Sequence, residues 1–544
     1  MTYRDVEAHQ AAKTAPRERI HLFDTTLRDG AQTPGIDFSV EDKITIAGML
    51  DAFGLDYVEG GYPGANPTDT AFFRERRTRN AAFTAFGMTK RAGVSASNDP
   101  GLAMLLDAKA DAICFVAKAW DKHVHVALGC TLPENLESIR LSVEAARARG
   151  REVLVDCEHF FDGFKANREH ALDCARTAYE AGARWVVLCD TNGGTQPIDV
   201  RAIVDATCRE AVPGDHLGIH AHDDTGQAVA NSLAAVNAGA RQIQGTLNGI
   251  GERCGNANLV SIIPTLVLKP SFRERFQTGI AEEKVAGITR LSRAFDELLN
   301  RAPDTQAPYV GASAFATKAG IHASALLKDP TTYEHVPPES VGNSRNVMVS
   351  DQGGRSNFLA ELSRRGIAVD KADPKLDRLI GIVKEREAEG YAYEAADASF
   401  ELLARRTLGT VPAFFAVESY NVSVEKRFNA LGEAVTVSQA VVKVEVGDER
   451  LLSVAEGMGP VNALDQALRK DLGRYQDAIA DLELVDYKVR ILNGGTEAVT
   501  RVLIESADAT GARWWTLGVS HNIIDASFEA LLDSLTYKLL QSAA

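Results

Sequence analysis

Between residues 20 and 270, short runs rich in β-branched and aromatic residues alternate with longer segments in which apolar residues recur every three or four positions. There are eight such runs, at residues 20–26, 55–63, 81–88, 111–119, 152–158, 184–191, 216–222 and 241–249. Eight βα units over about 250 residues are typical of a TIM (β/α)8 barrel. A doubly wound open sheet would show the same alternation. The number of units favours the barrel, as does the lack of a GxGxxG turn after the first run.

The rest of the chain predicts further domains, because 544 residues exceed what one hydrophobic core can organise. Residues 271–400 are mainly helical in pattern, and from about residue 405 alternating strands are followed by helices, which indicates a small α+β domain. We therefore expect an α/β fold in four segments: a disordered N-terminus (1–19), a catalytic TIM barrel (20–270), a helical linker and lid (271–400) and a C-terminal α+β domain (401–544).

Composition excludes several classes of protein. Hydrophobic residues make up 45% and charged residues 24%, as in ordinary globular proteins. A formal charge of −15 disfavours a nucleic-acid partner. The seven cysteines are odd in number and scattered, so no disulfide framework is expected. The first residues lack the apolar segment of a secretory signal, and no long apolar run occurs, so we expect a cytoplasmic protein without a membrane partner.

Two polar motifs follow strands that would lie close together in a closed barrel. The first strand ends in DTTLRDG, which contains Arg28 and Asp29, and the seventh ends in IHAHDD, where His220 and His222 project to the same side. Taken alone, each motif is more often structural than functional. However, TIM-barrel active sites lie at the carboxyl ends of the strands, and closure brings strands 7, 8 and 1 together. We therefore expect Asp29, His220 and His222 to bind one cation.

The glycine-rich turn GIGERCGNAN follows the eighth strand and can bring the side-chain carbonyl of Asn256 to the same cation. One carboxylate, two imidazoles and one amide oxygen, with positions left open, suit Mg²⁺, Mn²⁺ or Zn²⁺ in six-coordination. Such a cation could chelate a 2-oxo acid through its ketone and carboxylate oxygens. Arg28, which is always charged, would then stabilise the oxygen that becomes negative.

Two further residues at the barrel mouth have ordinary alternatives that the spacing leaves open. Glu158 follows the fifth strand in DCEHFFD and is either a general acid or base, or a loop carboxylate. Thr191 follows the sixth strand in CDT and either binds a substrate carboxylate or caps a helix. Cys157 and Cys254 also fall near the mouth, and we expect both to be inert packing residues.

The motifs DTTLRDG, IHAHDD and GIGERCGNAN, in this order and strand placement, resemble the DRE-TIM metallolyases and Claisen-condensing synthases. This family comprises isopropylmalate, homocitrate and citramalate synthases, with HMG-CoA lyase as a relative. KAGIHASAL and TTYEHVPPESVGN resemble the synthase lid, and AEGMGPVNALDQALR resembles the C-terminal regulatory domain. DCEHFFDGFKAN is more similar to the long citramalate synthases, which use pyruvate, than to isopropylmalate synthases, where this region reads FSPEDA.

The resemblance implies a role for each candidate residue. The implied metal ligands are Asp29, His220, His222 and Asn256. Arg28 is implied as the catalytic arginine, Glu158 and His322 as acid/base groups, and Thr191 as a ligand of the substrate carboxylate, with Asp29 and Arg28 also at the substrate. His322 and Tyr333 are implied to form a lid pair that reaches the neighbouring subunit's site, which implies a homodimer.

The reaction implied is a Claisen condensation in isoleucine biosynthesis. Acetyl-CoA loses a methyl proton, its enolate attacks the ketone of pyruvate, and thioester hydrolysis yields (R)-citramalate and CoA. Which of Glu158 and His322 takes the methyl proton stays open. The C-terminal domain implies feedback inhibition, with isoleucine as the expected effector.

Rival functions remain to be weighed against this one. A 2-isopropylmalate synthase would use 2-oxoisovalerate, and a homocitrate synthase would use 2-oxoglutarate. The lid segment and the C-terminal domain argue against a lyase like HMG-CoA lyase. A non-enzymatic metabolite sensor with a relic barrel is disfavoured because every expected polar residue is present in the barrel.

Overall fold

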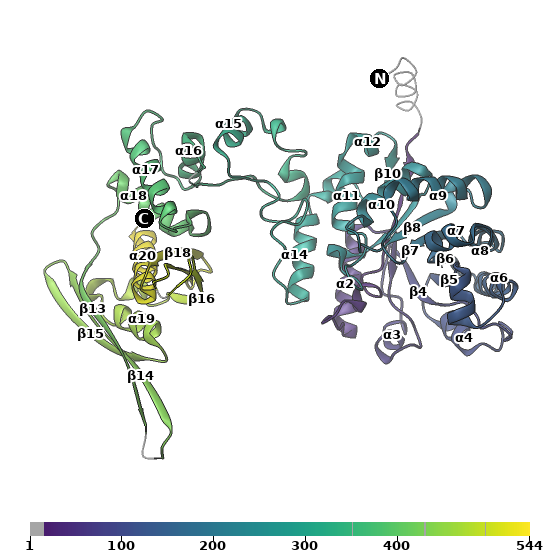
Figure 1. The fold of residues 1–544 in the computed structure, drawn as a ribbon, viewed down its shortest axis with the longest axis horizontal. Helices are drawn as coiled ribbons and strands as arrows, with labels where there is room; N and C mark the ends of the chain where they lie inside the picture. Colours follow the sequence, from purple (N-terminus) through teal and green to yellow (C-terminus); the bar gives the residue numbers. More distant parts are fainter. Residues whose placement is uncertain (1–15, 351, 429–430, 496, 544) are drawn as a thin grey trace. The chain divides into compact units, whose positions relative to one another are not determined.

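The structure is a computed structural model that describes residues 16–350, 352–428, 431–495 and 497–543. Its chain forms two compact units, Met1–Phe315 with Val336–Arg345, and Ala316–His335 with Asn346–Ala544 (Figure 1). Most of the expected disordered N-terminus, residues 1–15, lies outside the described residues. The four segments expected from the sequence remain a prediction.

All eight predicted strands belong to one closed parallel barrel. Its strands are, in order, β2 (His21–Asp24), β3 (Tyr57–Glu59), β4 (Ala82–Met88), β5 (Ala112–Lys118), β6 (Glu152–Glu158), β7 (Trp185–Asp190), β8 (Leu217–Ala221) and β9 (Gln242–Gly245). β9 pairs with both β8 and β2, and this pairing closes the barrel. The predicted TIM barrel is confirmed, and the open-sheet alternative is wrong.

Helices between the strands cover the outside of the barrel (Figure 1). The main ones are α2 (Val40–Phe53), α3 (Pro67–Phe72), α4 (Pro100–Asp107), α6 (Leu132–Ala148), α8 (Arg168–Glu180), α9 (Pro197–Glu210), α10 (Ala228–Ala238) and α11 (Leu259–Leu268). Local sequence sets their ends. Ser39 and Asp42 form a capping box at the start of α2, and Gly54 ends that helix in the left-handed conformation, with a φ of 107°.

Shorter elements complete the first unit. They are the turns η1 (Gly30–Gln32), α5 (Asp121–His123), η2 (Val124–Leu128), α7 (Phe160–Ala166), η3 (Gly214–His216) and η4 (Leu247–Gly249), then α12 (Pro270–Arg273), α13 (Glu282–Val285), α14 (Ile288–Leu298) and η6 (Pro338–Val341). β1 (Glu18–Arg19) pairs in parallel with β10 (Phe276–Gln277). Glu18 and Arg19, which fall in the segment expected to be disordered, are ordered, because Glu18 N donates to Arg275 O at 2.9 Å.

Large side chains fill the amino-terminal half of the barrel interior. Phe23, Tyr57, Leu154 and Trp185 form one buried cluster there, and Trp185 Nε1 donates to the Tyr57 hydroxyl at 3.0 Å. This packing closes the barrel beneath its carboxyl end, as expected for a TIM barrel. The residues of the candidate site therefore lie above this packed layer, towards the carboxyl end.

Most elements of the second unit that precede the C-terminal domain are helices. Its elements before the C-terminal domain are β11 (Ala316–Thr317), α15 (Gly320–Lys328), η5 (Pro330–Thr332), β12 (Asn346–Val347), α16 (Arg355–Arg364), α17 (Pro374–Ala388), η7 (Tyr393–Ala395) and α18 (Asp397–Leu408). A buried cluster that includes Phe358, Leu376, Val383 and Phe400 holds α16, α17 and α18 together.

Two antiparallel sheets of three strands form the C-terminal domain. The elements are β13 (Ala416–Phe428), β14 (Ala434–Val446), β15 (Glu449–Gly457), α19 (Pro460–Lys470), η8 (Gly473–Tyr475), η9 (Asp477–Ile479), β16 (Glu483–Ile491), β17 (Thr500–Ala507), β18 (Arg513–Ser520) and α20 (Ile523–Ala543). Each sheet is followed by one long helix, so the predicted α+β domain is confirmed. Among the described residues, no helix has the length and apolar character needed to cross a membrane.

Candidate active site

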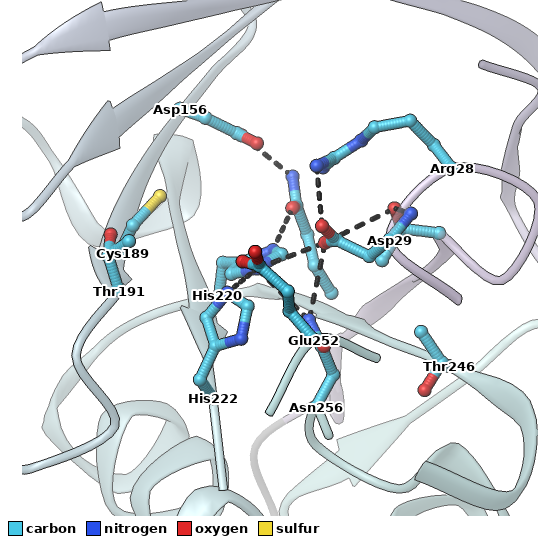
Figure 2. Close-up of polar contacts among 12 residues, drawn as sticks. Arg28, Asp29, Asp156, Cys189, Thr191, His220, His222, Thr246, Glu252 and Asn256 are labelled. Atoms are coloured by element: carbon cyan, nitrogen blue, oxygen red, sulfur yellow. Dashed lines mark hydrogen bonds and ion pairs between the residues drawn. The ribbon is translucent and has the colours of Figure 1, made fainter. Parts of the chain in front are cut away.

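Asp29, His220 and His222 converge at the carboxyl end of the barrel (Figure 2). Asp29 follows β2, His220 lies in β8, and His222 comes directly after that strand. His220 Nε2 lies 3.2 Å from Asp29 Oδ2 and 3.3 Å from His222 Nε2. All three residues are buried, and their ligand atoms lie within 4.8 Å of one another. The structure thus brings together three of the four expected metal ligands as a group that could hold an ion.

The protonation of this group suits a cation. His220 Nδ1 lies 2.7 Å from the side-chain oxygen of Gln244, which can only accept, so Nδ1 carries the proton and Nε2 offers a lone pair. Burial, together with the nearby His220, lowers the pKa of His222 to about 3. Burial by itself raises the pKa of Asp29, but the charge of Arg28 and the other groups around the carboxylate lower it on balance. Neutral imidazoles beside a carboxylate are the forms that bind metals.

Asn256 reaches the same point, but with the opposite atom from the one expected. Its Nδ2 lies 3.2 Å from Asp29 Oδ2 and 3.2 Å from His220 Nε2, so the amide nitrogen, rather than the carbonyl oxygen, faces the group. Asn256 Oδ1 is buried and has no hydrogen-bond partner among the described residues. A half turn of the amide would direct this acceptor at the group, where a cation would satisfy it. The donor set therefore fits a metal.

Arg28 is held beside the group by two carboxylates. Its Nη1 donates to Asp29 Oδ1 at 2.6 Å and its Nε donates to Glu59 Oε2 at 2.7 Å. The guanidinium also lies over the Phe86 ring, 3.9 Å from the ring centre. Thr25 Oγ1 donates to the same Glu59 oxygen at 2.5 Å. These contacts fix the plane of the guanidinium and leave other N–H groups of Arg28 for a ligand.

A cavity of about 720 Å³ opens over these residues. Its lining includes Arg28, Asp29, Glu158, Thr191, His220 and His222. These are six of the candidates from the barrel sequence. Cavities of this size hold ligands larger than a small oxo acid, so the cavity has room for part of a second substrate.

Glu158 lies at the edge of this cavity as one half of an ion pair. Its carboxylate contacts the ammonium group of Lys118. The two residues are register partners at the ends of β5 and β6, which is why their side chains leave the barrel together. Glu158 is therefore a cavity residue rather than a surface loop carboxylate. Lys118, which also lines the cavity, is absent from the sequence prediction.

Thr191 is fixed by the loops on either side of it. Its Oγ1 accepts from the backbone N–H of His159 at 2.9 Å, so its own hydroxyl hydrogen is available to another acceptor. Its backbone oxygen accepts from Arg253 Nη2 at 2.7 Å, and Arg253 in turn binds both carboxylate oxygens of Asp224, at 2.7 and 2.9 Å. The helix-cap alternative is wrong, because α9 begins at Pro197 with Gln196 as its N-cap.

The expected lid pair lies in the second unit. The rings of His322 and Tyr333 stack with their centres 4.4 Å apart and their planes 28° apart. Both residues are exposed, Tyr333 to 49%. Of the two cysteines expected to be packing residues, Cys157 is fully buried and burial raises its pKa, but Cys254 is exposed, because it lies in the turn after the last barrel strand.

Three family models match the chain in succession. The HMGL-like model matches residues 19–291, the homocitrate synthase post-HMGL domain-like model matches residues 309–388, and the LeuA allosteric (dimerisation) domain model matches residues 394–539. Together with the barrel and its buried Asp/His/His group, they define a TIM-barrel enzyme of the HMGL-like class with an allosteric domain.

Relatives of known name cover almost the whole chain. The (R)-citramalate synthase of Aquifex aeolicus is 47% identical over 96% of this chain and 98% of its own length, and that of Streptomyces coelicolor is 48% identical over 96% and 97%. A probable 2-isopropylmalate synthase of Methanopyrus kandleri is 32% identical over 95% and 97%. The chain belongs to the (R)-citramalate synthase family of condensing acyltransferases.

Proposed function

We propose that this chain condenses acetyl-CoA with pyruvate to give (R)-citramalate and CoA. The observation that carries the proposal is the convergence of Asp29, His220 and His222 beside Arg28 in one cavity. The choice of pyruvate is supported by the higher identity to relatives named (R)-citramalate synthase, 47% and 48%, than to the relative named a probable 2-isopropylmalate synthase, 32%.

Asp29, His220, His222 and, after a half turn of its amide, Asn256 would hold a divalent cation such as Mg²⁺, Mn²⁺ or Zn²⁺. When bound, this cation supplies the Lewis acidity that polarises the ketone of a 2-oxo acid. The chain's contribution is to keep His222 neutral and Asp29 charged, and to hold His220 Nδ1 against Gln244, in a site that is already assembled.

Two residues orient the oxo acid. The hydroxyl of Thr191, whose oxygen is occupied by His159 N, donates its hydrogen to the pyruvate carboxylate. The free N–H groups of Arg28 bind the ketone oxygen, which gains negative charge as the new C–C bond forms. Because Glu59 and Asp29 hold the guanidinium in place before the substrate binds, little reorganisation is needed during the reaction.

A base must take one methyl proton from acetyl-CoA, and two residues are candidates. Glu158 lines the cavity beside Lys118, and His322 lies in the segment that resembles the synthase lid. The resulting enolate carbon bonds to the ketone carbon, the alkoxide takes up a proton, and water cleaves the thioester to release CoA. The rate at which acetyl-CoA exchanges its methyl protons is measured in the Glu158→Gln and His322→Asn variants. The variant that lacks the base should lose this exchange.

A substrate panel tests the proposed reaction. The protein is incubated with acetyl-CoA, Mg²⁺ or Mn²⁺, and pyruvate, 2-oxoisovalerate or 2-oxoglutarate, and thiol release is followed. The largest kcat/KM is expected with pyruvate. A preference for 2-oxoisovalerate over pyruvate would contradict pyruvate as the acceptor. If no oxo acid leads to CoA release, the proposed condensation is wrong.

We further propose that the chain is a homodimer inhibited by isoleucine. The match of residues 394–539 to the LeuA allosteric (dimerisation) domain supports both parts. Light scattering should give twice the chain mass of 58.6 kDa. Isoleucine should lower the rate of CoA release more than leucine or valine does, and equal responses to all three would contradict the choice of effector.

A further inference from the structure

Two consecutive hydrogen bonds cross the barrel interior behind His220. The side-chain oxygen of Gln244, in β9, lies 2.7 Å from His220 Nδ1, and Gln244 Nε2 donates to Asp156 Oδ1, in β6, at 2.9 Å. Gln244 is 0% exposed and Asp156 is 3% exposed. His220 and Gln244 are register partners in adjacent strands, so this contact follows from the pairing that closes the barrel.

The direction of these hydrogen bonds fixes the protons. Asp156 Oδ1 accepts, so the nitrogen of the Gln244 amide must face it and the oxygen must face His220. An amide oxygen cannot donate, so Nδ1 of His220 must carry a proton, and Nε2 is the ring nitrogen that can bind a cation. The lone pair is then on Nε2, the atom that lies 3.2 Å from Asp29 and 3.3 Å from His222.

We propose that Gln244 and Asp156 are positioning residues that hold His220 in the Nδ1-protonated tautomer and thereby prepare its Nε2 to bind the cation. The inference rests on the metal site of the proposed function. Residues behind metal-binding histidines commonly set ring orientation and basicity in this way, and their loss costs about 10- to 100-fold in metal affinity.

Gln242 offers a matched control. It lies two residues earlier in β9 and is also 0% exposed. Neither atom of its side-chain amide has a hydrogen-bond partner within the described part of the chain. A buried glutamine in this strand therefore need not bind a histidine. Gln242→Met removes the same kind of amide, equally buried in the same strand, without touching His220.

The test compares Gln244→Met, which removes the acceptor, with Gln244→Glu, which keeps an acceptor for Nδ1. Mn²⁺ affinity, measured by titration calorimetry, should fall about 10- to 100-fold in Gln244→Met and stay close to wild type in Gln242→Met. Gln244→Glu keeps the acceptor for His220 but loses the donor to Asp156, so its affinity should fall less than that of Gln244→Met. Asp156→Leu, which frees the amide to rotate, should show a smaller loss than Gln244→Met. Thermal melting shows that each variant is folded.

A second readout needs no metal. In metal-free protein labelled with ¹⁵N-histidine, the ring shifts of His220 should report protonation at Nδ1 in wild type and a mixture of tautomers in Gln244→Met. Unchanged Mn²⁺ affinity and unchanged shifts in folded Gln244→Met would overturn the inference, as would an equal loss in Gln244→Glu. A wild-type protein that binds no Mn²⁺ would overturn the proposed metal site, whereas the shifts would still test the tautomer.

Discussion

Oδ2 of Asp29 lies 3.2 Å from Nε2 of His220, although Asp29 follows the first strand of the barrel and His220 lies in the seventh. They meet because β9 pairs with β2 on one side and with β8 on the other. The candidate metal site is therefore a product of barrel closure. Any change that opens the β2–β9 pairing should disperse it.

Arg28→Lys should lower kcat strongly while leaving the fold intact. A lysine supplies one point charge and cannot bind Asp29 and Glu59 with two separate N–H groups while also facing a substrate oxygen. Losing a group aimed at a developing negative charge costs about 100- to 1,000-fold in kcat. Steady-state kinetics of CoA release measure this, and a variant with near wild-type kcat would contradict the proposed role.

Thr191→Val should lower kcat/KM for pyruvate more than it changes KM for acetyl-CoA. The valine keeps the shape of the side chain but has no hydroxyl hydrogen for the substrate carboxylate, and a hydrogen bond to a charged group is worth about 1.5 to 3 kcal/mol. We expect kcat/KM for pyruvate to fall by about 10- to 100-fold, with a smaller effect on KM for acetyl-CoA. Thr191→Ser should recover most of the loss. If serine and valine behave alike, the hydroxyl has no such role.

Asp24 should make stability depend on pH. Burial raises the pKa of this carboxyl from 3.8 to about 7, so it stays neutral in the folded chain at pH values where the unfolded chain has lost the proton. The contribution of Asp24 to the free energy of unfolding is therefore fully present below about pH 4. It falls by up to about 4 kcal/mol as the pH rises towards 7.

Asp24→Asn removes this dependence. The difference in melting temperature between the variant and wild type should move in the variant's favour from pH 4 to 7 and then level off. Asp107→Asn is a control, since the Asp107 side chain is 73% exposed. A pH-independent difference for Asp24→Asn would contradict the raised pKa.

If His322 and Tyr333 reach the neighbouring subunit, each active site should contain residues of both chains. If His322 of one chain completes the site of its partner, a heterodimer of the His220→Ala and His322→Ala chains contains one intact site. Random mixing of these two inactive variants should then restore about a quarter of wild-type activity. No recovery after subunit exchange, with heterodimers shown by native mass spectrometry, would mean that His322 acts within its own chain.

The sequence predicted the barrel well because all eight strands carry strong local signals. The expected run 152–158 coincides with β6 (Glu152–Glu158), and the other seven overlap their strands, with ends that differ by up to four residues. In the C-terminal sheets, long stretches of alternating residues mark β14 and β17. In each case the local period alone identifies the element.

Contacts across the barrel were harder to predict. Glu59, Lys118 and Gln244 each lie in a strand with no motif around them, and their roles appear only when the strands are in register. Asn256 lies beside Asp29 and His220, as expected. The orientation of its amide depends on contacts within the glycine-rich turn, which the spacing of residues in the sequence cannot predict. Cys254 shows the same limit, since exposure in a turn is set by tertiary structure.

Metal dependence of the condensation tests the central claim most directly. Wild type, His220→Ala and, as an exposed control, His125→Ala are stripped with chelator and titrated with Mn²⁺, and Mn²⁺ binding and CoA release from acetyl-CoA with pyruvate are measured together. Wild type and His125→Ala should bind one Mn²⁺ per chain and regain activity in proportion, whereas folded His220→Ala should do neither. Full activity of stripped wild type, or of His220→Ala, would contradict the metal site and the mechanism built on it.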